Sequence, residues 1–283
     1  MASNPAFNRI EKDAKDGYAG FGGPGASAAQ QSAAAQAATA GMSAQQLQDL
    51  YNQPAAGPVD TRRVTMDDVI MKTLALFAIV LVTAAAGWAV AANNPNAGSA
   101  IWIGGMIGTL VIGLIIAFKK TLSVPLILLY AVVEGLFMGA VSQFFNVAYP
   151  GIVGQAVLAT LATFAGMFLA YKFGLIKVTA KFRRIMTMMI FGYVIFAIVN
   201  FVFAAFWSDS PFGFGGTGGW GIAISVFAVG LASFTLALDF DSIEGAIRSG
   251  APQKYSWLLA HGLIVTLVWL YIEFLRLFAR LRS

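Results

Sequence analysis

Seven long apolar segments follow one another from Val69 to the C-terminus, and they constrain the fold more than any other feature of the chain. Each is about 18 to 25 residues long, the length that an α-helix needs to cross a ~30 Å hydrocarbon layer. None shows the period-two alternation of a membrane strand, so each is predicted to span a bilayer as a helix. The segments are Val69 to Ala92, Ile101 to Phe118, Thr121 to Asn146, Gly151 to Tyr171, Ile185 to Trp207, Gly219 to Leu238 with a helical extension, and Tyr255 to Leu275.

The scarcity of charge supports the same fold class. Of the 283 residues, 58% are hydrophobic and only 11% are charged, whereas a soluble domain carries roughly 25% charged residues. We therefore predict an all-α membrane protein whose main partner is the lipid bilayer. The chain has no cysteine, which excludes disulfides, thiolate nucleophiles and iron–sulfur clusters. The net charge is +5, but the cations are scattered among apolar segments, so no nucleic-acid partner is expected.

The first 64 residues differ in composition from the rest of the chain. They contain low-complexity runs such as ASAAQQSAAAQAATAG and no apolar run long enough for a signal peptide. We predict a disordered tail over residues 1–64 and a transmembrane domain over residues 65–283. Thr65 and Asp68 have the spacing of a capping box, which predicts that the first helix begins there.

The lysines and arginines indicate an orientation. If the tail is cytoplasmic, the three loops assigned to the opposite side carry none of them. Arg276, Arg280 and Arg282 at the C-terminus disagree with this pattern, because seven spans place that end outside. Either the positive end is tolerated there or the last helix is not a simple crossing. The cations assigned to the cytoplasmic side are Arg9, Lys12, Lys15, Arg62, Arg63, Lys119, Lys120, Lys172, Lys177, Lys181, Arg183, Arg184, Arg248 and Lys254.

Three carboxylates fall within the predicted spans. Glu134 lies in the third span, Asp239 near the end of the sixth, and Glu273 in the last. An ionisable group costs about 2.5 to 3.5 kcal/mol at the centre of a bilayer and persists there only with a partner or a function. Because removal from water favours the protonated carboxyl, such groups are candidates for proton sensing or cation binding; a role limited to joining helices is the alternative.

The neighbours of Asp239 give two further expectations. Asp241 and Glu244, with Arg248 one turn later, are predicted to form a solvated helix face at the membrane edge. His261, the only histidine, lies at a depth similar to that of Asp239 if the last two helices form a hairpin. The two side chains are therefore candidates for a contact, and an interhelical hydrogen bond without a switching role is the simpler interpretation.

Small residues also recur at helical spacing. Gly104 and Gly108, like Gly135 and Gly139, are four residues apart, a spacing typical of close helix crossings in membranes. The glycine-rich stretch from Gly213 to Gly221 lacks the following Lys-Ser/Thr of a phosphate-binding loop, so we interpret it as a flexible outer loop.

The candidate residues do not fit the common intramembrane enzymes. An aspartyl protease needs two aspartates on facing helices, whereas Asp239 and Asp241 share one predicted helix. A single histidine is too few for a zinc protease, no serine stands in a convincing Ser–His pattern, and Lys254 precedes the last span where a retinal lysine would lie. We expect no catalytic activity and no cofactor.

Three motifs, in order, resemble the Bax inhibitor family: EGLFMG in the third span, DFDSIEGAI closing the sixth and LYIEFLRLF in the last. The N-terminal SNPAFNR and GYAGFGG are similar to its bacterial YccA-like branch. The resemblance covers about residues 60–280. It implies six helices around a central C-terminal helix, and a multi-pass protein of the bacterial inner membrane with a cytoplasmic N-terminus.

The resemblance also implies a pH-sensitive calcium leak channel, gated by a carboxylate pair that joins the sixth and last helices. Asp239 matches the first acid and Glu273 the second, and both are then candidate ligands for calcium in transit. Glu273 is a glutamate rather than an aspartate and lies ~16 Å beyond the depth of Asp239 at helical rise. Glu134 and His261 are therefore alternative neighbours for one of the acids.

A second hypothesis comes from a different class of function. The chain is then a non-transporting regulator that binds a membrane-bound protease or stress factor, with the N-terminal tail as its handle. An ordinary secondary transporter is a third possibility, but no inverted repeat supports it.

Overall fold

The structure is a computed structural model that describes residues 62–119, 121–207 and 212–283. These residues form seven helices and no strand, apart from one isolated bridge between Arg63 and Pro252. All seven helices are long and apolar enough to cross a membrane, which confirms the predicted all-α membrane fold. They are α4 (Met66–Asn93), α5 (Pro95–Phe118), α6 (Val124–Ala148), α7 (Ile152–Lys172), α8 (Ala180–Phe206), α9 (Gly219–Arg248) and α10 (Tyr255–Arg282).

Capping residues set the helix ends, so several helices extend beyond their apolar runs. The Thr65 side chain accepts a hydrogen bond from the Asp68 N–H at 3.2 Å, as the capping box predicts. Asn94 ends α4, and its side chain accepts from two N–H groups in the first turn of α5, with Pro95 at the start of that helix. The turn between α4 and α5 is therefore tight.

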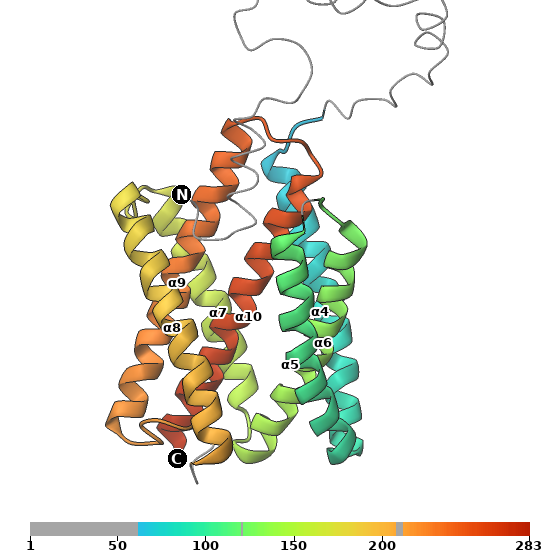
Figure 1. The fold of residues 1–283 in the computed structure, drawn as a ribbon, viewed down its shortest axis with the longest axis vertical. Coiled ribbons are helices and arrows are strands. Elements are labelled where there is room, and N and C mark those ends of the chain that lie inside the picture. The colour runs from blue at the N-terminus through green and yellow to red at the C-terminus, as the bar shows by residue number, and fades with distance from the viewer. Residues whose placement is uncertain (1–61, 120, 208–211) are drawn as a thin grey trace, which may run out of the picture.

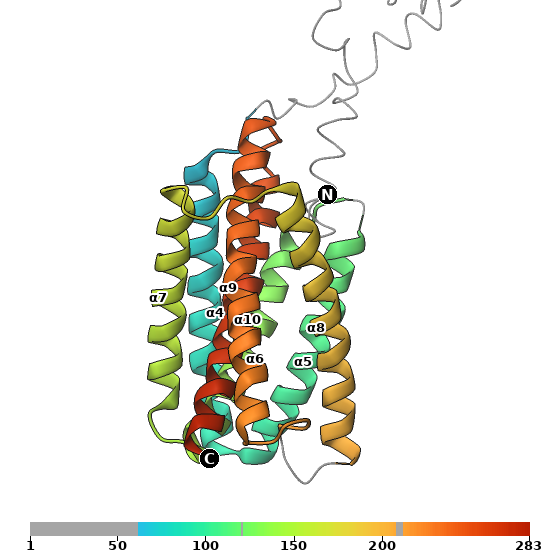
Figure 2. The same ribbon diagram turned by 90° about the vertical axis from the view of Figure 1, so that its left-hand side faces the viewer.

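The seven helices form one bundle in which α10 runs obliquely between two groups of three (Figure 1). On one side α4, α5 and α6 pack on one another, and on the other α7 and α8 pack on α9. The view turned by 90° places α7 at one edge and α5 and α8 at the other (Figure 2). Helix α10 itself packs mainly on α4, α6, α7 and α9. The arrangement of six helices around a central C-terminal helix therefore stays a prediction.

Burial separates the inner helices from the outer ones. In its most apolar stretch α10 is 72% buried, whereas α4, α5, α7 and α8 are at most 22% buried. The exposed side chains of these four helices are large and apolar, among them Leu81, Leu114, Leu158 and Phe191. In a protein that spans a membrane such faces contact lipid, and this contact needs no polar covering.

Glycines allow the closest approach in the bundle, between α4 and α6. A Cβ atom on Gly135 would collide with Thr83, and one on Gly139 would collide with the backbone of Ala84. The prediction of a close crossing is confirmed for this pair. In the other pair it holds for Gly108, where an added Cβ would lie 3.2 Å from Val133 of α6, and is wrong for Gly104, which has nothing within 4 Å. The neighbouring Gly105 instead packs tightly against Phe137 of α6.

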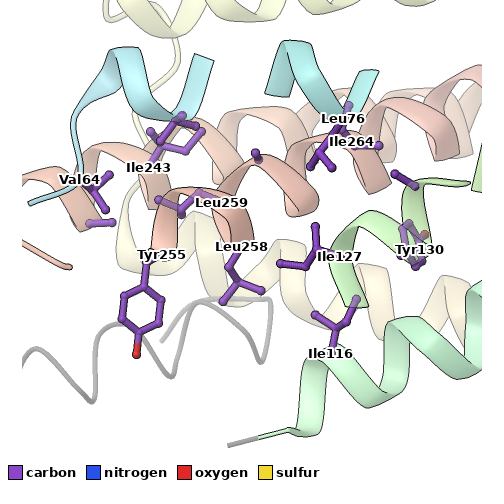
Figure 3. Packing of buried hydrophobic residues seen from close by; sticks show 14 of the residues in the cluster. Val64, Leu76, Ile116, Ile127, Tyr130, Ile243, Tyr255, Leu258, Leu259 and Ile264 are labelled. Carbon is purple, nitrogen blue, oxygen red and sulfur yellow. The ribbon is translucent and has the colours of Figure 1, made fainter. Parts of the chain in front are cut away.

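The largest apolar cluster joins the start of α10 to four other helices (Figure 3). Val64, just before α4, is buried in this cluster, and its N–H donates to the Ala251 carbonyl at 2.8 Å. The Gln253 N–H donates to the Arg62 carbonyl at 2.8 Å. Of the predicted tail, 1–64, only residues 62–64 lie within the described residues, and they are joined to the loop between α9 and α10.

Candidate functional site

Asp239 lies in the interior of α9, where the helix continues for ~14 Å beyond it to Arg248. Its side chain is buried, and its Oδ2 atom has no hydrogen-bond partner. The adjacent Leu236 and Phe240 belong to an apolar cluster with Leu263 of α10. Thr266 of α10 faces Asp239 as a hydrogen-bonding side chain. Among the described residues no cation pairs with this carboxyl.

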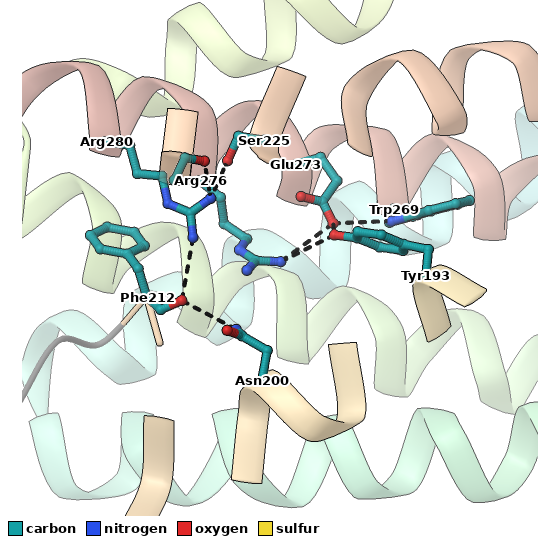
Figure 4. A network of polar contacts seen from close by, with 9 residues as sticks. Tyr193, Asn200, Phe212, Ser225, Trp269, Glu273, Arg276 and Arg280 are labelled. Carbon is teal, nitrogen blue, oxygen red and sulfur yellow. Dashed lines mark hydrogen bonds and ion pairs between the residues drawn. The ribbon is translucent and has the colours of Figure 1, made fainter. Parts of the chain in front are cut away.

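Glu273 lies in a separate polar network, shown in Figure 4. Its Oε1 atom accepts a hydrogen bond from the Tyr193 hydroxyl of α8 at 2.5 Å and another from the Trp269 indole at 3.2 Å. The Arg276 Nη1 atom lies 3.4 Å from the same oxygen. The Oε2 atom is buried and has no partner. Glu273 therefore joins α10 to α8 and carries its counter-charge on its own helix.

Glu134 is buried on α6 and interacts with Tyr130 on its own helix and with Thr109 of α5. The Tyr130 ring makes an edge contact with the buried His261 ring of α10, with centroids 4.4 Å apart. Tyr130 thus links the acid of the third span to the only histidine. The sequence offered no signal for Tyr130, which is one of several aromatic residues in its helix.

The four predicted site residues are thus all buried, but the structure does not bring all four together. No hydrogen bond or ion pair of the described residues joins Asp239 to Glu273, or Asp239 to His261. No three acidic or histidine side chains of the described part of the chain form a group that could hold a metal ion. The acids instead occupy three positions along the bundle, with Glu134 and His261 linked through Tyr130.

The end of α9 matches the predicted solvated face only in part, because the side chains of Glu244 and Arg248 are exposed but that of Asp241 is not. Asp241 is only 14% exposed and forms an ion pair with Arg183 of α8. Glu244 accepts a hydrogen bond from the Tyr171 hydroxyl of α7 at 2.5 Å and lies 3.4 Å from Arg248. Packing of α8 on α9 removes Asp241 from the predicted solvated face, whereas Glu244 and Arg248 stay partly exposed.

Sequence reasoning also missed the role of Arg280, whose side chain is 2% exposed. Its Nη1 atom donates to the Gly221 carbonyl and the Ser225 hydroxyl, both at 2.6 Å, and its Nη2 atom donates to the Phe212 carbonyl at 3.3 Å (Figure 4). The Asn200 side chain donates to the same Phe212 carbonyl at 3.2 Å. Arg280 therefore anchors the described end of the loop before α9, and the start of α9, to the end of α10.

Seven membrane-spanning helices with three carboxyls buried among them define a multi-pass membrane protein with ionisable groups in its interior. A family model described as Bax inhibitor 1 like matches residues 4–283. The chain therefore belongs to this family, and the resemblance carried by EGLFMG, DFDSIEGAI and LYIEFLRLF is confirmed at that level. No curated protein matches the sequence. Membership of the bacterial YccA-like branch stays a prediction.

Proposed function

We propose that the chain is a non-enzymatic, pH-sensitive leak pathway for calcium or another cation, gated by its buried carboxyls. We further propose that it acts in the bacterial inner membrane with its N-terminus in the cytoplasm. Family membership and the burial of acidic groups inside a membrane bundle support the proposal. The sequence motifs and the charge distribution support the location.

The environment of Asp239 is the observation that carries the proposal. The helices around it supply a threonine and apolar side chains but no cation. An ionised carboxylate in such surroundings costs several kcal/mol unless a charge or water reaches it. Ionisation of Asp239 must therefore either admit a cation or move α9 away from α10. Both outcomes link proton release to opening of a path.

Glu273 and Glu134 have different roles in this scheme because their surroundings differ. Glu273 faces Arg276 and Tyr193, so its charge is balanced where it lies. It holds α8 against α10. Glu134 faces Tyr130 and Thr109, and Tyr130 in turn contacts His261. Glu134 and Tyr130 lie on the other side of α10 from Glu273. They form a second position at which oxygen atoms of the protein replace water molecules around a cation in transit.

Calcium flux into liposomes tests the proposal. Purified full-length chain should admit calcium at a rate that changes with pH, and Asp239→Asn should lose most of that pH dependence. Glu244→Gln is the matched control, since Glu244 lies on the same helix but at its partly exposed end. It should retain the pH response. Equal flux and equal pH response in the wild type and Asp239→Asn would refute the role of Asp239.

A second candidate function is favoured by the contact between the end of the N-terminal tail and the loop between α9 and α10. Residues 62–64 pair with the loop between α9 and α10, so a protein that binds the tail acts directly on the hairpin that carries Asp239 and Glu273. The chain is then a regulator of a membrane-bound protease or stress factor. Capture of such a partner by the full-length chain but not by residues 60–283, with no calcium flux from either, would favour this function over the leak pathway.

A further inference from the structure

A cavity of about 450 Å³ lies between α4 and α7, with α6 and α10 behind it. The volume is within the range of ~300 to 1,000 Å³ typical of ligand sites. Helices α4 and α7 do not pack closely on each other. Lining residues at the mouth are exposed, since Leu81 is 53% and Leu161 46% exposed. The cavity therefore opens sideways onto the apolar surface that faces lipid.

The cavity extends over one half of the membrane. On α4 it is lined from Phe77, near the middle of the helix, to Trp88, near the end that precedes α5. These residues lie ~16 Å apart at helical rise, about half of the ~30 Å hydrocarbon layer. Tryptophan is enriched at the membrane interface. The cavity thus runs from the middle of the bilayer to the interface of one leaflet.

The wall of the cavity offers little to a polar occupant. No charged side chain of the described residues lines it. The Ser142 and Tyr271 hydroxyls lie 2.7 Å apart and bond each other, and the Thr160 hydroxyl donates to the Ala156 carbonyl at 2.8 Å. A bound water needs two to four polar partners, and the hydrogens of these hydroxyls are already donated within the protein, which leaves only lone pairs. A cation would find no carboxylate. The occupant is therefore apolar and elongated.

We propose that the acyl chain of a bilayer phospholipid occupies this cavity, with its headgroup at the level of Trp88. The cavity is continuous with the lipid-facing surface, where phospholipid chains are the most abundant neighbours, and it matches the depth of one leaflet. The chain would contact Ile264 and Val268 of α10 and Met138 of α6. The inference does not depend on the proposed ion pathway, because the three buried acids do not line the cavity.

Two alanines on α4 provide a matched test. Ala85 and Ala86 are both exposed, but only Ala85 lines the cavity. Full-length wild type, Ala85→Phe and Ala86→Phe are purified in detergent with added dioleoyl phosphatidylethanolamine, and retained lipid is counted by native mass spectrometry. We expect one tightly held phospholipid on the wild type and on Ala86→Phe, and at least a tenfold lower occupancy on Ala85→Phe. Equal retention by all three proteins would overturn the proposal. So would a retained mass of a free fatty acid or of a second copy of the chain.

A second measurement keeps the test decisive if Ala85→Phe does not fold. Wild type and Trp88→Phe are reconstituted in vesicles of brominated phosphatidylcholine and then transferred to detergent without bromine. The difference in fluorescence between the wild type and Trp88→Phe gives the emission of Trp88. This emission should stay quenched after transfer. Full recovery of this contribution would show that the lipid near Trp88 exchanges freely, and would overturn the proposal.

Discussion

Gly139 and Gly104 each belong to a pair of glycines four residues apart, but substitution by alanine should change the stability of the protein in opposite directions at the two positions. Gly139 of α6 packs against the backbone of α4, where an added Cβ would collide with the Ala84 carbonyl and lie 2.7 Å from the Trp88 nitrogen. Neither atom can rotate away, so α4 and α6 must separate. Overpacking of this kind costs about 1 to 3 kcal/mol. Gly104 of α5 has nothing within 4 Å of an added Cβ, and alanine there should gain about 0.5 to 1 kcal/mol in helix stability.

Thermal unfolding of the purified protein in detergent measures the contrast. The two effects separate Gly139→Ala from Gly104→Ala by about 1.5 to 4 kcal/mol. At about 2 to 4 °C per kcal/mol for a domain of this size, Tm should fall in the first variant and rise slightly in the second. The Tm of the wild type should lie between those of the two variants. Equal shifts in both variants, or a lower Tm for Gly104→Ala than for Gly139→Ala, would refute the close contact of α4 with α6.

Two other predictions concern the C-terminal end of the bundle. Arg280→Met should speed hydrogen exchange in residues 212–218, because it removes the donors that hold the Phe212 and Gly221 carbonyls. Arg282→Met, an exposed position, should leave exchange there unchanged. Because the chain has no cysteine, an impermeant maleimide can report topology. It should label Ser283→Cys in intact cells but Ser249→Cys only after permeabilisation, and the reverse pattern would invert the proposed orientation.

The helices could be predicted from the sequence because the bilayer fixes their length. A ~30 Å apolar layer demands about 20 apolar residues, and each of the seven runs meets that demand. The ends could not be predicted from hydropathy, because hydrogen bonds rather than lipid set them. Helix α8 begins at Ala180, where the Thr179 side chain accepts from the Phe182 N–H, several residues before its apolar run.

The burial of the candidate acids could be predicted, but their partners could not. A carboxyl inside a span has to be removed from lipid, so Glu134, Asp239 and Glu273 are buried. Which group each one meets depends on helix rotation, which spacing does not define. Tyr193, the donor to Glu273, comes from a helix eighty residues earlier in the chain. Nothing in the local sequence distinguishes it from the other aromatic residues of α8.

The contacts of the three C-terminal arginines explain why these residues depart from the distribution of the other cations. Arg276 faces Glu273, Arg280 donates to carbonyls within the bundle, and Arg282 donates to the Pro150 carbonyl at 2.9 Å and to Gln155 at 2.7 Å. Arg276 thus pairs within α10, whereas Arg280 and Arg282 join α10 to other parts of the chain. Orientation rules concern cations in short loops that contact the membrane surface. Arginines held by protein acceptors satisfy their charge within the fold, so they do not argue against an odd number of crossings. The loop cations alone then remain as the sequence signal for orientation, and they support the proposed cytoplasmic tail.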